Sequence, residues 1–164
     1  MVVSETPSPS PTPTALSDDE LLAMIPEEAQ REDFFGASAF AKFFVDLYPD
    51  LFESPPKPEL FNKLSAEVCK FCAGALADAA ATQDAGAHNT GGEFAWPDEL
   101  ARGGLNDDGY WYVTQAFEVA DTVTYLADGS VYKTEAGGTG EVGLKLDFAE
   151  GAWSVLGVEF VYDR

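Results

Sequence analysis

Basic residues are scarce in this sequence. Nine lysines and arginines stand against 29 aspartates and glutamates among 164 residues, which gives a formal net charge of -20 at pH 7. A protein that binds nucleic acid needs a basic surface that releases counterions, and the nine basic residues are scattered along the chain. We therefore expect no nucleic acid among the partners. The acidity itself favours solubility, with a cation-binding surface or a basic partner as the alternative.

Long apolar runs and histidine are scarce as well. No stretch approaches the roughly 20 apolar residues that span a bilayer, so we expect no membrane-spanning segment. The single histidine, His88, lies in a stretch rich in glycine and asparagine, where a surface position is expected. No Gly-x-Ser-x-Gly motif occurs, so nothing supports a Ser-His-Asp hydrolase. We predict no catalytic residue and no cofactor.

The N-terminal residues have a composition that cannot build a core. Residues 3–14 are dominated by proline, serine and threonine. Proline fixes φ and lacks an amide donor, which favours an extended, solvated segment. We predict a tether over residues 1–16 and one folded domain over residues 17–164. A stalk that holds the domain away from a membrane or wall is the favoured interpretation, and a proline-rich ligand for an SH3-like groove is the alternative.

The first half of the predicted domain has helical periodicity. Ser17 and Glu20 match a capping box, which predicts a short helix that ends near Met24. Apolar residues then recur at steps of three and four residues, as on one face of a helix. These patterns predict further helices over residues 33–52, 59–64 and 67–83.

After Gly86 the apolar period changes to two, which predicts strands. In residues 110–119 the alternation sends Trp111 to one face and Tyr112 to the other. Asp128-Gly129 predicts a type I′ hairpin turn, and Gly157 predicts a bulge in the last strand. The strands are expected over residues 94–96, 110–119, 121–127, 130–134, 142–148 and 153–162. Helices followed by mostly antiparallel strands predict an α+β fold.

This order of elements resembles the nuclear-transport-factor-2-like (cystatin-like) cone, in which a curved sheet wraps helices around a pocket. More specifically, the chain resembles a family of uncharacterised actinobacterial lipoprotein domains. The resemblance covers the Pro/Ser/Thr-rich spacer, the apolar helix at Ala37–Leu47, the pair Cys69 and Cys72, the Gly-rich link at residues 91–96 and a closing Trp153-x-Val155.

The resemblance implies N-terminal helices packed on a curved, mostly antiparallel sheet. It also implies an extracytoplasmic domain that is tethered to the outer face of the cell membrane by a lipid anchor on the natural precursor. The lipidated cysteine of the family is absent from this sequence, and no activity is established for the family.

The two cysteines form a Cys-x-x-Cys pair, Cys69 and Cys72. Cysteines three apart on one face of a helix lie close enough for a disulfide, and an oxidising compartment favours a structural bridge. A redox-active pair would need a preceding strand, and zinc would need two more ligands. We expect a structural disulfide and no metal, with these alternatives and free buried thiols left open.

Three residues are candidates for a ligand pocket: Asp46, Tyr48 and Trp111. The tyrosines beside Trp111 alternate onto the opposite face, so one set should line the core or pocket and the other should be partly exposed. The loop Asn106-Asp107-Asp108-Gly109 matches part of a calcium-loop pattern but lacks its remaining ligands, and we expect a plain turn there.

These observations favour a non-enzymatic accessory domain that binds a small molecule or an envelope protein. One alternative is an enzyme of the cone fold that uses Asp46, with Tyr48, as acid or base. An open pocket with a carboxylate of raised pKa would support that alternative. The other is a module that forms a homodimer through an exposed apolar patch around Trp111 or Tyr112.

Overall fold

The first helix begins at a residue that caps it. The computed structural model describes residues 16–163, so the tether predicted over residues 1–16 lies outside the described residues except for Leu16. The Ser17 hydroxyl accepts the Glu20 N–H, and the Glu20 carboxylate accepts the Ser17 N–H, which confirms the capping box. The helices are α1 (Asp18–Leu22), η1 (Glu27–Gln30), α2 (Phe34–Asp46), η2 (Pro49–Phe52), α3 (Glu59–Leu64) and α4 (Lys70–Asp84), where η marks a 3-10 helix.

Two predicted helix boundaries are wrong. The helix expected over residues 33–52 ends at Asp46, and a separate 3-10 helix begins at Pro49. Proline lacks the N–H donor and its ring clashes with the preceding turn, so the α-helix cannot continue through Pro49. The helix expected to begin at residue 67 begins at Lys70, because Cys69 is its N-cap with extended backbone angles (φ -73, ψ 97).

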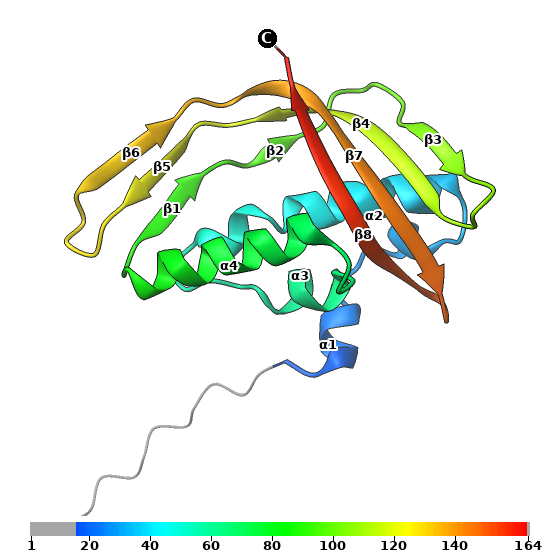
Figure 1. Cartoon of the computed structure of the whole chain (residues 1–164), viewed down its shortest axis with the longest axis horizontal. Coiled ribbons are helices and arrows are strands. Elements are labelled where there is room, and N and C mark those ends of the chain that lie inside the picture. The colour runs from blue at the N-terminus through cyan, green and yellow to red at the C-terminus, as the bar shows by residue number, and fades with distance from the viewer. Residues whose placement is uncertain (1–15, 164) are drawn as a thin grey trace, which may run out of the picture.

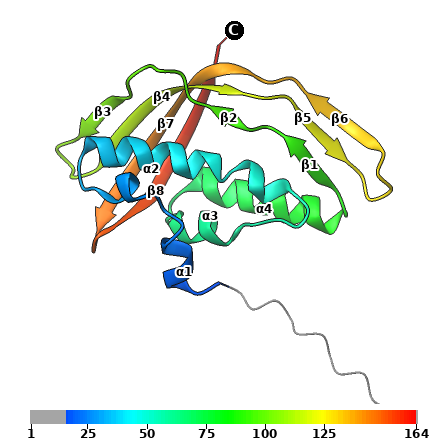
Figure 2. The ribbon, with the colours of Figure 1, turned by 180° about the vertical axis from the view of Figure 1, so that it is seen from behind.

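The strands form two antiparallel sheets that curve over the helices. They are β1 (His88–Gly91), β2 (Phe94–Ala95), β3 (Arg102–Leu105), β4 (Trp111–Val119), β5 (Thr122–Tyr125), β6 (Val131–Glu135), β7 (Gly138–Ala149) and β8 (Ala152–Tyr162). One sheet has the order β1-β5-β6, and the other has the order β2-β4-β7-β8 with β3 also paired to β4. Figures 1 and 2 show these strands as an arch with α2 and α4 beneath it. The predicted α+β fold with a curved, mostly antiparallel sheet is confirmed.

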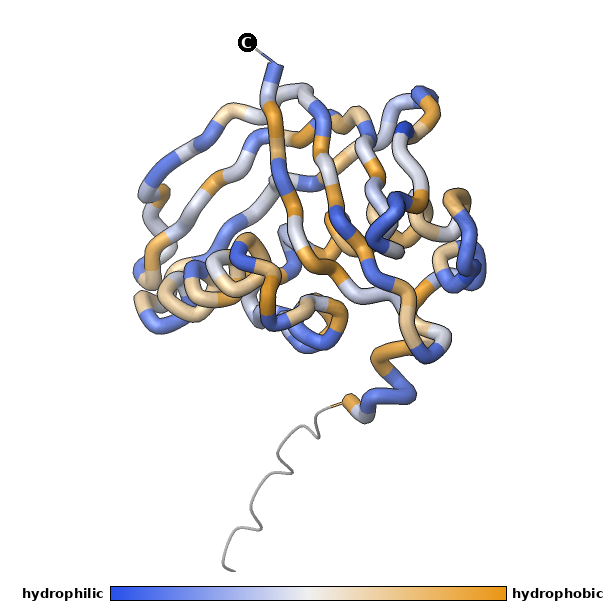
Figure 3. Tube along the Cα trace, turned by 45° about the vertical axis from the view of Figure 1, so that its right-hand side comes forward, coloured by the Kyte–Doolittle hydropathy of each residue, from blue (hydrophilic) through white to orange (hydrophobic). Residues whose placement is uncertain are grey.

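The core lies between the concave face of the arch and the helices. In β4 the predicted alternation is confirmed, since Val113, Gln115 and Phe117 are buried. From the helices, Phe44 stacks on Phe61 with ring centroids 4.5 Å apart. The same alternation of hydrophobic and hydrophilic residues is visible along β7 and β8 in Figure 3. In residues 16–163 no helix is long and apolar enough to cross a membrane.

Two strands, β1 and β3, were not predicted. Both are short and lie at sheet edges, and β3 contains Gly103 and Gly104, so no apolar alternation marks them. Gly103 is required by its close approach to β4, because a Cβ atom there would lie 1.9 Å from the Tyr112 carbonyl oxygen. His88, expected in a surface link, belongs to β1, where its half-buried ring stacks on Tyr125 with centroids 5.4 Å apart.

The predicted turn type between β5 and β6 is wrong, whereas the predicted bulge is confirmed. A type I′ turn needs positive φ at both central residues, but only Gly129 has one (φ 84), and its N–H bonds to the Leu126 carbonyl. Glu150 (φ 54) and Gly151 (φ 77) provide two such residues in the β7–β8 turn. In β8 the register shifts between Val155, which pairs with Leu146, and Gly157, which pairs with Lys145, so Leu156 is the extra residue beside the predicted Gly157.

Candidate functional site

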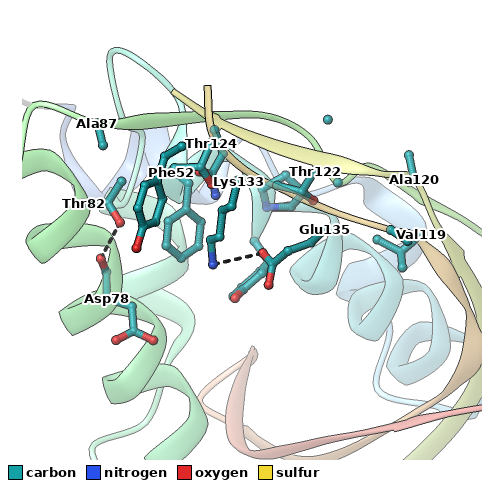
Figure 4. Close-up of a pocket in the computed structure, with 18 of the residues that line it drawn as sticks. Phe52, Asp78, Thr82, Ala87, Val119, Ala120, Thr122, Thr124, Lys133 and Glu135 are labelled. Atoms are coloured by element: carbon teal, nitrogen blue, oxygen red, sulfur yellow. Dashed lines mark hydrogen bonds and ion pairs between the residues drawn. The ribbon is translucent and has the colours of Figure 1, made fainter. Parts of the chain in front are cut away.

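A cleft of about 970 Å³ lies between α4 and the three-stranded sheet β1-β5-β6 (Figure 4). Residues of η2 and the end of β8 complete its lining. The fold produces this space because β8 pairs with β7 only as far as Gly140 opposite Tyr162. Helix α4 packs against β8, as in the contact of Phe71 with Phe160 (centroids 5.5 Å apart). Beyond the end of β8, the sheet and α4 are therefore separated by the cleft.

The floor of the cleft is apolar and largely aromatic. Tyr48 and Phe52 meet edge to face, with centroids 5.3 Å apart, at one end of the floor. Phe94, Val119 and Tyr162 continue the lining from β2, β4 and β8. Aromatic rings offer a large contact area to an apolar body, and their edges and faces also attract polar and cationic groups.

Polar side chains occupy the walls. On the sheet side, the Lys133 ammonium lies 3.4 Å from a carboxylate oxygen of Glu135. On the helix side, Asp78 and Thr82 face this pair across the cleft (Figure 4), and the Thr82 hydroxyl donates to the Asp78 carbonyl at 2.9 Å. The cleft walls thus carry two carboxylates and one ammonium group.

Further along the sheet wall, Thr124 is buried and its hydroxyl donates to the Asn89 side-chain oxygen at 2.8 Å. This hydrogen bond joins β5 to β1 at the cleft surface. It leaves the Asn89 amide group free of any hydrogen bond to another residue in the described range, so that this group can serve a ligand in the cleft.

The charges of the walls act on the phenols of the floor. Burial raises the pKa of Tyr48, and the neighbouring groups Asp78, Tyr162 and Glu135 raise it further. Burial, followed by the Glu135 charge, also raises the pKa of Tyr162. Both phenols therefore stay protonated at neutral pH and can each donate and accept a hydrogen bond.

Of the three pocket candidates from the sequence, the structure places only Tyr48 in the lining of the cleft. Asp46 lies at the surface near the end of α2, where its carboxylate accepts the indole N–H of Trp96 at 3.0 Å. Neighbouring atoms shield part of this surface carboxylate from water and so raise the pKa of Asp46, and the hydrogen bond from Trp96 opposes that effect. Trp111 packs edge to face on Trp153 of the core, with centroids 5.7 Å apart.

The predicted disulfide between Cys69 and Cys72 is present. The sequence analysis placed both residues on one face of a helix, and this placement is wrong. Cys69 is the N-cap of α4, Cys72 lies in the first turn, and their Cα atoms are 5.2 Å apart. Both cysteines are buried and lie outside the lining of the cleft, which fits a structural role for the bridge.

The expected turn at residues 106–109 is confirmed. The Asn106 side-chain oxygen accepts the N–H groups of Asp108 (3.1 Å) and Tyr110 (3.0 Å), and the Gly109 N–H bonds to the Asn106 carbonyl. This asparagine oxygen thus stabilises the turn itself. Across residues 16–163, no three His, Cys, Asp or Glu side chains gather closely enough to hold a metal ion.

Sequence reasoning missed the wall residues Asp78, Thr82, Lys133 and Glu135. A weak signal for two of them exists in α4, where Asp78 and Thr82 are spaced by one turn along one edge of the buried face formed by Cys72, Ala75 and Ala79. That Asp78 and Thr82 lie opposite Lys133 and Glu135 has no signal in the sequence, because the width of the cleft depends on where β8 ends.

Comparison with known proteins finds the fold but no family. No family model matches the sequence, and no curated protein matches it. Among solved structures, the chain is similar to the intermembrane space region of the chloroplast protein ARC6, with a TM-score of 0.63 and 12% identity over 81% of this chain and 99% of that chain.

Two other solved structures have a TM-score of 0.45. One is Aln2 from a Streptomyces species, with 15% identity over 77% of this chain and 89% of that chain. The other is a periplasmic fragment of TraM, with 11% identity over 78% of this chain and 98% of that chain. The likeness to ARC6 supports the α+β fold alone, so the nuclear-transport-factor-2-like cone and the actinobacterial lipoprotein family stay predictions.

Proposed function

We propose that this chain is an accessory module of the cell envelope that holds a ligand or a partner segment in the cleft between α4 and β1-β5-β6. The cleft carries the proposal. Its volume of about 970 Å³ and its apolar floor with a few polar groups on the walls are typical of binding sites. The residues on those walls come from separate parts of the chain, which the fold brings together around one space.

The extracytoplasmic location is part of this proposal. A disulfide between Cys69 and Cys72 persists in an oxidising compartment. The Pro/Ser/Thr-rich residues 3–14 suit a stalk, and their resemblance to a lipoprotein spacer supports a tether at the outer face of the membrane. The similar fold of ARC6 belongs to a region in an intermembrane space, which is compatible with such a location.

Binding is favoured over catalysis by the position of the proposed acid or base. The enzyme alternative relied on Asp46 acting with Tyr48 inside a pocket. Tyr48 lines the cleft, but the Asp46 carboxylate lies outside it and is bonded to Trp96. The pair therefore does not converge on one ligand position, and we retain the binding function as the proposal.

The test fills the cleft and leaves the core intact. Ala81 is exposed on α4 and lines the cleft, whereas the neighbouring Ala80 is exposed and does not line it. We expect Ala81→Trp to abolish the binding of any species that copurifies with the full chain from its host's envelope, and Ala80→Trp to preserve it. Native mass spectrometry measures both. Equal retention by the two variants, or a chain recovered only from the cytoplasm, would refute the proposal.

A further inference from the structure

Strand β6 has an edge that no other strand covers within residues 16–163. It pairs with β5 on one side, and all five of its residues are exposed. The chain continues from β6 into β7, and the same edge of β7 is covered by β8. The last contacts of that end of the chain with β7 are Gly140 with Tyr162 and the Asp163 N–H with the Thr139 carbonyl. Figure 1 shows β8 leaving the arch before it reaches β6. Such an edge presents backbone donors and acceptors to an added strand.

This edge borders the cleft. Tyr132, Lys133 and Glu135 belong to β6 and line the cleft, and Asp78 and Thr82 line it from α4. A chain that paired with β6 would extend the three-stranded sheet by one strand, in the continuation of β8 and along the rim of the cleft. Because side chains alternate along a strand, every second side chain of that chain would enter the cleft above the aromatic floor.

We propose that the cleft binds an extended basic segment of a partner protein, which pairs its backbone with the edge of β6 and directs a lysine or arginine side chain toward Asp78 and Glu135. This inference deepens the proposed function and rests on it. It specifies both the chemistry of the partner and the backbone that receives it.

Charge selects a basic segment. The walls carry two carboxylates, Asp78 and Glu135, against the single ammonium of Lys133, so negative charge is in excess there. The whole chain has a net charge of -20, which attracts a cationic segment and speeds its encounter. The floor suits the same side chains, because lysine and arginine pack their aliphatic stems on apolar surface and their charges on aromatic faces.

A second copy of this chain is disfavoured by the same charge. Two copies would each bring a net charge of -20 to the contact, and like charges across an interface lower affinity. The exposed Val131 and Tyr132 of β6 would still accept a neutral or basic strand. The proposal therefore commits to a segment of another protein.

The test uses the full chain and fluorescein-labelled peptides that alternate lysine with threonine, with glutamate–threonine peptides of equal length as the matched probe. We expect the lysine peptide to bind about tenfold or more tightly than the glutamate peptide at low salt, by fluorescence anisotropy. Asp78→Asn should weaken that binding severalfold. Asp107→Asn, an exposed carboxylate in the β3–β4 turn, should leave it unchanged.

Strand pairing is tested on the peptide, so the protein's folding is not in question. Alternate N–H groups of a strand point to opposite edges, and methylation of every second nitrogen blocks one edge only. Two peptides are compared, one methylated at the odd-numbered and one at the even-numbered backbone nitrogens. The peptide methylated on the edge that faces β6 should bind about tenfold or more weakly, and the other should bind less than about threefold more weakly. Equal effects in the two peptides would overturn the proposal.

Three other results would also overturn it. These are equal affinities for the lysine and glutamate peptides, no binding of the lysine peptide at millimolar concentration, or a homodimer in sedimentation whose β6 amides are protected without peptide. If the peptides fail while Ala81→Trp still abolishes the binding of the copurifying species, the basic segment is refuted and the proposed function stands. If both fail, the proposed function falls as well.

Discussion

Two neighbouring side chains near the end of α2, Asp46 and Tyr48, lie on different surfaces of the molecule. Tyr48 turns its phenol to the cleft, whereas Asp46, two residues earlier, turns its carboxylate to Trp96 at the surface. Burial raises the pKa of Asp46, so the native state holds this proton more tightly than the unfolded chain does. The carboxylate is therefore a local cost in the folded state when it is ionised.

Asp46→Asn should remove that cost and keep an oxygen that accepts the Trp96 N–H. Because the folded pKa is raised, the wild-type chain loses stability from this group as the pH rises above its ordinary value of 3.8. Relative to the wild type, the variant should gain free energy of unfolding over that range, by less than about 1 kcal/mol since the side chain lies at the surface. Urea denaturation between pH 3 and pH 7 measures the difference. A difference that stays constant with pH would contradict the assignment.

The disulfide makes a second prediction at this scale. Replacing both Cys69 and Cys72 with alanine removes a cross-link that closes a very short loop at the start of α4. We expect the free energy of unfolding to fall by about 2 kcal/mol, with the fold retained. Protein isolated from its host should also be two hydrogens lighter than the reduced chain by intact mass spectrometry. Fully reduced cysteines in that sample would refute the bridge.

At the scale of elements, α2 packs against α3 through aromatic side chains. Phe44 is fully buried and stacks on Phe61 of α3, whereas Phe35 on the same helix is 73% exposed. We expect Phe44→Ala to lower the free energy of unfolding by about 3–5 kcal/mol, because it removes apolar contacts and leaves a cavity. Phe35→Ala should change it by less than about 0.5 kcal/mol. Similar losses in the two variants on chemical denaturation would show that α2 does not pack as described.

Elements with strong local signals could be predicted from the sequence. The capping box at Ser17, the periodicity of α2 and the alternation of β4 each depend on neighbouring residues, and the structure has them. Elements that depend on distant contacts could not. Strand β3 needs glycine at Gly103, where its backbone approaches β4 closely, and with Gly104 beside it no apolar alternation marks the strand.

The candidate site was predicted less well for the same reason. Tyr48 was identified as an aromatic residue beside a carboxylate, and it lines the cleft. Trp111 follows the same strand alternation as Val113, and alternation leaves a core position and a pocket position both open; the structure places Trp111 beside Trp153 of the core. Asp78 and Glu135 are 57 positions apart (135 minus 78) and line opposite sides of the cleft only through the tertiary fold.

At the scale of the whole molecule, the cleft arises from a mismatch in strand length. The arch continues through β5 and β6, while β8 ends at Tyr162. Helix α4 packs against β8 and not against β5 and β6. The end of the arch thus has one face that looks onto α4 across the cleft and one backbone edge without a partner in the part of the chain that the structure describes. Both features lie at the same end of the molecule, which is why we assign binding to it.

Hydrogen–deuterium exchange tests most directly whether this cleft is the binding site. The full chain would be compared alone and with envelope extract from its host, together with the Ala81→Trp chain. We predict that the extract slows exchange at the β6 amides, residues 131–135, in the wild-type chain and leaves them unchanged in Ala81→Trp. Unchanged exchange in β6 with new protection elsewhere, for example at residues 105–112, would contradict the account.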